Sequence, residues 1–172
     1  MRILVRNLSG KVISEDSRRA EIPENRSIQA GMTEGAVPEE ELFFVTLYLE
    51  EEGRTLSENT YMFGTREKEV FAPLFKNTGR TELKSEKWET RRDGRLCVKA
   101  TLINIGERAV LDAGIALSGN QYYLLGSDND RVLFPGEERT FSLVLIPKKS
   151  VGFSESENYD GSEVPKLTVH WL

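Results

Sequence analysis

Apolar and polar residues alternate along much of this chain with a period of two, which is the spacing of a β-strand with one face buried. Over residues 43–50, every odd position is apolar, from Phe43 to Leu49. Three consecutive glutamates and Gly53 follow, and this combination predicts a turn. A second strand over residues 55–63 would complete a hairpin.

A second hairpin is predicted over residues 82–104, where Asp93-Gly94 is a dipeptide that favours a two-residue turn. Its second strand would place alternate residues inward, namely Leu96, Val98, Ala100 and Leu102. The same pattern predicts further strands at 3–8, 12–14, 19–22, 111–117, 131–134, 140–146 and 167–171.

The segments between the strands predict turns and loops. Residues 33–41 and 148–163 are poor in apolar side chains and are expected to be surface loops, and residues 65–76 hold at most one helical turn because of Pro73. Short strands of this spacing predict an all-β fold, an immunoglobulin-like (fibronectin III-like) antiparallel β-sandwich of about nine strands. A length of 172 residues fits one domain, so we expect a single domain over 1–172.

Composition and charge exclude several classes of function. The net charge of −5 and the interspersed acidic residues argue against nucleic-acid and membrane-surface partners. No apolar run approaches the ~20 residues of a transmembrane helix. The single cysteine, Cys97, excludes an internal disulfide, and its position in an apolar alternation favours a packed strand thiol over a nucleophile. Nothing in the sequence predicts the compartment.

Few residues could form a catalytic or metal site. His170 is the only histidine, so neither a multi-histidine zinc site nor a Ser-His-Asp catalytic triad is expected. The acidic run 128–130 lacks the glycine and the distal glutamate of a calcium loop, and a capped turn is the favoured interpretation. We therefore predict no catalytic residue, no metal and no cofactor. The amides of Asn59 and Asn104 are expected to satisfy backbone groups at strand ends.

Four segments carry a resemblance to a known family. They are residues 44–61 with Asn59-Thr60-Tyr61, residues 101–117 with Asn104-Ile105-Gly106, residues 127–137 with Ser127-Asp128-Asn129 and Pro135-Gly136-Glu137, and the terminal strand 167–172. Together they resemble the C-terminal immunoglobulin-like domain of family 2 glycoside hydrolases of the β-mannosidase and exo-β-glucosaminidase type. Asp130 and Arg131 depart from the family pattern, which has an aromatic residue after Asn129.

The resemblance implies that this domain belongs to a larger, retaining glycoside hydrolase, β-mannosidase-like, whose two catalytic glutamates lie in a (β/α)₈ barrel. Such a barrel needs about 250 residues and does not fit here. The resemblance therefore implies a non-catalytic accessory domain whose partners are the barrel and the other domains of the same parent chain. In that setting it would stabilise the barrel, and its loop 119–130 is a candidate for the active-site rim.

Two other functions remain open at this point. An independent carbohydrate-binding module would use surface aromatic residues to stack on sugar rings, and the candidates are Trp88, Tyr122, Tyr123 and Trp171. Core or interdomain packing is the competing, and favoured, role for the same side chains. An adhesion or scaffold domain would share the fold without either function.

Overall fold

The structure is a computed structural model, and it describes residues 1–21, 23–29, 42–64, 79–91, 95–119, 122–126, 131–148 and 165–171. Within these residues it contains eleven strands and no helix, so the predicted all-β fold is confirmed. None of this described part could cross a membrane as a long apolar helix. The chain divides into two compact units, Met1–Asn77 and Thr78–Leu172, which we call the first and second units.

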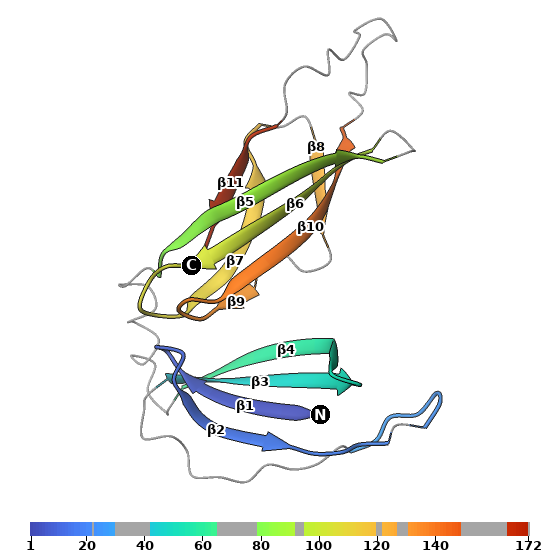
Figure 1. Cartoon of the computed structure of the whole chain (residues 1–172), viewed down its shortest axis with the longest axis vertical. Helices are drawn as coiled ribbons and strands as arrows, with labels where there is room; N and C mark the ends of the chain where they lie inside the picture. Colours follow the sequence, from blue (N-terminus) through green and yellow to red (C-terminus); the bar gives the residue numbers. More distant parts are fainter. Residues whose placement is uncertain are drawn as a thin grey trace, which may run out of the picture. The chain divides into compact units, whose positions relative to one another are not determined.

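The first unit contains one antiparallel sheet with the strand order β2-β1-β3-β4 (Figure 1). The strands are β1 (Arg2–Asn7), β2 (Val12–Ser17), β3 (Leu42–Glu51) and β4 (Arg54–Gly64). The predicted hairpin is β3 and β4, which pair from Leu42 opposite Gly64 to Glu51 opposite Arg54. Gly53 has a φ of 78° in the turn, a conformation that glycine adopts without steric cost.

One face of this sheet holds buried side chains. Phe44 and Thr46 of β3 are fully buried, and Leu4 and Arg6 of β1 are nearly so. Arg6 Nη2 donates to Thr46 Oγ1 at 3.3 Å, and Thr46 Oγ1 lies 3.1 Å from the hydroxyl of Thr60. The pairing of strands places all of these residues on the same face, because residues opposite each other in a ladder point the same way.

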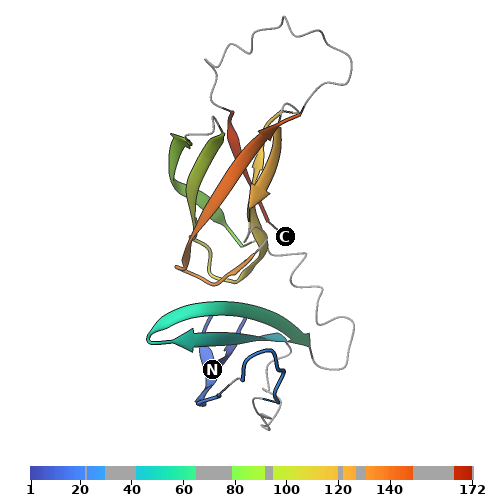
Figure 2. The same ribbon diagram turned by 90° about the vertical axis from the view of Figure 1, so that its right-hand side faces the viewer.

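The second unit is a two-layer sandwich of seven strands (Figure 2). One sheet has the order β5-β6-β10-β8 and the other the order β11-β7-β9. The strands are β5 (Thr81–Thr90), β6 (Leu96–Asn104), β7 (Val110–Leu117), β8 (Tyr122–Gly126), β9 (Arg131–Leu133), β10 (Glu138–Pro147) and β11 (Leu167–His170). Four strands facing three is the arrangement of an immunoglobulin-like sandwich.

The core of the second unit lies between these two sheets. Val98, Ala100 and Leu102 of β6 are at most 1% exposed, and Leu96 packs against them, so the predicted inward face of this strand is confirmed. Residues of the other sheet meet them from the opposite side; Ile115 is 1% exposed and Leu133 is fully buried. Cross-sheet burial of this kind is the main stabilising contribution in a β-sandwich.

Asn104 joins two turns at one end of this sandwich. Its Nδ2 donates to the carbonyl oxygens of Arg108 at 2.7 Å and Leu133 at 2.8 Å, and its Oδ1 accepts from the N–H of Gly106 at 2.9 Å. The side chain is fully buried. The predicted role of this amide is confirmed. The same prediction is wrong for Asn59. This side chain is exposed, and its Nδ2 lies 3.5 Å from the hydroxyl oxygen of Ser57 and does not bond a backbone group.

Two local predictions differ from the structure. Residues 19–21 form no strand. Strand β8 lies inside the predicted loop 119–130, where Tyr122-Tyr123-Leu124-Leu125 lacks the alternation of a half-buried strand. It pairs with β10 from Gly126 opposite Leu143 to Tyr122 opposite Pro147.

Other predictions fall outside the described residues. They are the Asp93-Gly94 turn, the run Ser127–Asp130, the loop 33–41, the segment 65–76 and nearly all of the loop 148–163. Each unit is described by itself, and the single domain expected over 1–172 stays a prediction.

Candidate functional site

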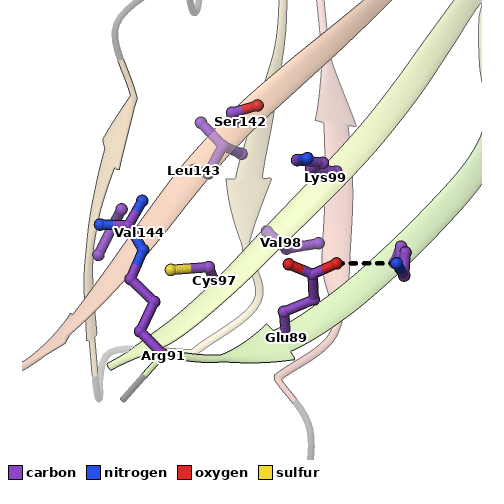
Figure 3. A pocket seen from close by; sticks show the side chains of 9 residues that line it. Glu89, Arg91, Cys97, Val98, Lys99, Ser142, Leu143 and Val144 are labelled. Atoms are coloured by element: carbon purple, nitrogen blue, oxygen red, sulfur yellow. Dashed lines mark ion pairs between the residues drawn. The ribbon is translucent and has the colours of Figure 1, made fainter. Parts of the chain in front are cut away.

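A pocket of about 200 Å³ lies on the outer face of the β5-β6-β10-β8 sheet (Figure 3). The ladders explain its composition, because Lys87, Lys99 and Ser142 pair in one row and Glu89, Cys97 and Val144 pair in the next. These residues alternate with the core residues of the same strands and so point away from the core. The complete lining is Lys87, Glu89, Arg91, Cys97, Val98, Lys99, Ser142, Leu143 and Val144.

The pocket carries three cations and one carboxylate. Lys87 Nζ lies 2.8 Å from Glu89 Oε1, and both side chains are solvent-exposed. The hydrogen bond from Lys87, then its charge and that of Lys99, lower the pKa of Glu89. The same hydrogen bond and charge from Glu89 raise the pKa of Lys87. Arg91 and Lys99 leave the rim with an excess of positive charge.

The chemistry of this pocket does not match that of a retaining glycosidase. That reaction requires two carboxyl groups ~5 to 5.5 Å apart, one of them an acid with a raised pKa. The pocket contributes one carboxylate, Glu89, and its pKa is lowered. Cys97 lies in β6 as expected and is half-buried, with its side chain on the pocket side rather than in the core (Figure 3).

The predicted carbohydrate contacts occupy different surfaces. Tyr122 and Tyr123 are neighbours in β8 and therefore point to opposite faces. Tyr122 packs against the core. Tyr123 is 58% exposed, and the ammonium group of Lys148 lies 4.9 Å from the centre of its ring.

The two tryptophans come from other segments of the second unit, Trp88 from β5 and Trp171 from directly after β11. Trp88 pairs with Val98 and packs against the core, and no described residue accepts a hydrogen bond from its Nε1. Trp171 follows β11 and is 36% exposed. Of the four candidates, Tyr123 presents its ring most fully to solvent. Sugar binding by these side chains stays a prediction.

Metal-binding residues do not gather in the described part of the chain. No three His, Cys, Asp or Glu side chains there lie close enough to hold an ion. The acidic run Asp128–Asp130, which sequence patterns assign to a capped turn, lies outside the described residues.

The pocket was missed by sequence reasoning for a physical reason. Its residues come from three strands, and Ser142 is far from Lys87 in the chain although both pair with Lys99. Only the strand register brings them together. A sequence signal existed in the outward positions of residues 87–91, where two cations flank one carboxylate, but such runs are usually solvated surface.

The fold thus defines the chain as an all-β protein with a seven-strand antiparallel sandwich in its second unit. No protein-family model matches the sequence, and no curated protein matches it. Among solved structures, the chain is similar to the exo-chitosanase CsxA of Amycolatopsis orientalis, with a TM-score of 0.64 and 12% sequence identity. The match covers 99% of this chain and 22% of that chain. The chain therefore shares its fold with about a fifth of the exo-chitosanase.

Proposed function

We propose that this chain is a non-catalytic accessory part of a larger glycoside hydrolase, where it packs on the catalytic barrel and stabilises it. The observation that carries the proposal is the fold match, which extends over 99% of this chain but only 22% of an exo-chitosanase chain. The sequence resemblance supports it independently, because it names the same class of enzyme from short motifs. A β-mannosidase-like specificity of the parent is the finer form of the proposal.

The motifs that carry the resemblance act as structural elements in the second unit. Asn104 and Gly106 hold the turn after β6. The N–H of Gly136 donates to the carbonyl of Asn104, and Glu137 Oε2 accepts from the N–H of Phe134 at 3.1 Å. Residues used in this way maintain a scaffold, which is what an accessory domain requires.

The experiment compares the parent with the chain. The full reading frame that contains these 172 residues and the isolated chain are purified and assayed with aryl β-mannosides and β-glucosaminides. We expect turnover by the parent and none by the chain, and a parent shortened by the second unit should melt at a lower temperature. Hydrolysis by the isolated chain would contradict the proposal, and so would a reading frame without a glycosidase barrel.

A second function, an independent carbohydrate-binding module, is favoured by one observation. Tyr123 is 58% exposed, and the ammonium group of Lys148 lies over its ring at 4.9 Å from the centre. An exposed aromatic ring of this kind can stack on a sugar. Calorimetric titration with manno- and chito-oligosaccharides should then give a binding curve that Tyr123→Ala removes. Tyr61→Ala, at a 50% exposed tyrosine of the first unit, is the matched control. A flat titration of the unmodified chain would rule this function out.

A further inference from the structure

The sheet of the first unit has a second face that is apolar and only partly covered. The open face, as we call it, consists of Val5, Phe43, Val45, Leu47, Leu49, Tyr61 and Phe63. These residues share one side of the sheet because Val5 pairs with Val45, Val45 with Tyr61, and Phe43 with Phe63. The remaining β4 positions on this side, Ser57 and Asn59, are uncharged.

Exposure distinguishes this face from a finished core. Tyr61 is 50% exposed and Phe63 is 46% exposed, and the other members of the open face are half-buried. Ile3 and Asn7 of β1 lie on the same side and are buried, so the exposure is greatest towards β4. The rings of Phe43 and Phe63 are stacked with centroids 5.5 Å apart and an interplanar angle of 17°. An ordered aromatic pair with one ring nearly half exposed is more typical of an interface than of a solvated face.

The sequence of β3 agrees with this interpretation. Its residues 42–49 are apolar on both sides of the sheet, apart from Thr46 and the phenol of Tyr48. Strands covered on one face alternate apolar with polar residues, whereas strands covered on both faces are apolar almost throughout. Phe44 already lies fully buried on the opposite face. The composition of β3 therefore indicates a second cover on the open face.

We propose that the open face docks a second apolar β-sheet supplied by the rest of the parent polypeptide, which closes the first unit into a two-layer sandwich. This inference rests on the proposed function, because it requires a parent chain. The three strands that carry its apolar residues, ~4.8 Å apart, and about seven residues at ~3.3 Å each give a face of roughly 14 by 23 Å, which is wide enough to seat part of a second sheet.

The chemistry and the length of the chain identify the occupant. The central part of the open face, on β1, β3 and β4, carries no charge, whereas Asp16 of the edge strand β2 lies on the same side and pairs with Arg18. The partner must therefore present a largely apolar surface, as the inner face of another sheet does. The solved chain that this fold matches is several times longer than the matched part, which covers 22% of it. A sheet tethered in the same polypeptide has an effective concentration of roughly millimolar, and this favours it over a second copy of the chain.

Thiol labelling tests the proposal. In a Cys97→Ser background, Tyr61→Cys reports on the open face and Glu107→Cys, at an exposed turn of the second unit, is the control. Both variants are made in the isolated 172-residue chain and in the parent, and maleimide labelling rates are measured. We expect Tyr61→Cys to react at least about tenfold more slowly in the parent than in the isolated chain, because labelling then requires opening of the interface. Glu107→Cys should react equally in both.

Other results would overturn the inference. Equal labelling of Tyr61→Cys in both proteins would show that nothing covers the open face. Slow labelling in the isolated chain, together with a doubled mass by light scattering, would assign the face to a second copy. Phe63→Cys repeats the measurement if Tyr61→Cys does not fold, which circular dichroism checks. Glycosidase activity is scored separately, so a protected Tyr61→Cys in an inactive parent would refute the proposed function and leave the docking face.

Discussion

The two units of this chain share one pattern of alternation and differ in what covers it. In the second unit the alternating residues of β6 face another sheet, and Ala100 and Leu102 are fully buried. In the first unit the alternating residues of β4 include Tyr61 and Phe63, which are about half exposed. Alternation reports which residues share a face. It does not report whether a second layer covers that face. The presence of such a layer is what distinguishes the closed core of the second unit from the open face of the first.

The edge strands of the two units, β5 and β4, also differ in how much apolar surface they expose. Strand β5 is an edge of the second unit's larger sheet, and it carries Lys84, Glu86 and Lys87 together with a bulge between Leu83 and Ser85. Charges and bulges are the usual protection of an edge strand. Strand β4, an edge of the first unit's sheet, also has a bulge, at Leu56, but it ends in Tyr61-Met62-Phe63, all exposed. The apolar end of β4 is the kind of surface that the proposed docking of a second sheet would cover.

The largest expected effect contrasts one phenylalanine from each unit. Phe141→Ala removes a ring that is 1% exposed in the closed core and should cost the second unit about 3–5 kcal/mol of unfolding free energy. Phe63→Ala removes a ring that is 46% exposed and should cost about 1 kcal/mol, most of it from the stack on Phe43. Urea denaturation of the isolated chain measures both. Similar losses for the two variants would mean that the open face is already a finished core.

Two asparagines give the next largest contrast. Asn104→Ala leaves the carbonyls of Arg108 and Leu133 and the N–H of Gly106 without this amide in a buried place, and should cost about 2–4 kcal/mol. Asn59→Ala changes an exposed side chain of the open sheet and should stay within about 0.5 kcal/mol. Thermal melts with calorimetric detection measure the difference. A neutral Asn104→Ala would mean that water replaces the amide without loss.

Much of the fold could be predicted from the sequence because it depends on local chemistry. The inward face of β6 follows from alternation, and the turn at Asn104 follows from its side chain and Gly106. Strand β8 was missed because its apolar run has no alternation; its place depends on pairing with β10, a contact distant in the chain. That Tyr122 and Tyr123 point to opposite faces of the sheet could be predicted only once β8 is known to be a strand.

The candidate site was less predictable for the same physical reason. The pocket around Cys97 depends on the register of β5, β6 and β10, and the sequence does not state which lysine faces which serine. The open face was missed because alternation alone does not show whether a second layer is present, although the composition of β3, apolar on both sides, carries a signal for one.

Two glycines test the tightness of the packing. A Cβ at Gly126 would lie 2.2 Å from Cδ2 of Leu143, whose side chain is 2% exposed and has little room to move. Gly126→Ala should therefore cost about 1–3 kcal/mol. Gly53→Ala in the first unit meets no atom within 4 Å, so it should cost only the strain of a φ of 78°, about 1 kcal/mol. In a double-mutant cycle measured by urea titration, Gly126→Ala should cost less in a Leu143→Ala background than in the unmodified chain, because the clashing atoms are gone. Additive losses would contradict a clash with Leu143.

The smallest expected effect concerns the exposed ion pair of the pocket. The hydrogen bond and charge of Lys87 lower the pKa of Glu89, so this carboxylate favours folding above its ordinary pKa and loses that contribution as pH falls through the lowered value. Lys87 has a raised pKa, so its contribution is present at lower pH and is lost as pH rises through that value.

Carboxyl NMR titration should give Glu89 a midpoint below the ordinary glutamate value. Lys87→Gln should raise that midpoint toward the ordinary value, and Lys99→Gln should raise it less, because Lys99 acts through charge alone. High salt should weaken the effect, since screening at 1 M reduces the range of a charge to about 3 Å. Since both side chains are exposed, neither variant should shift the thermal midpoint measurably. A midpoint unaffected by Lys87→Gln would show that water, rather than the lysine, solvates Glu89 in this otherwise cationic pocket.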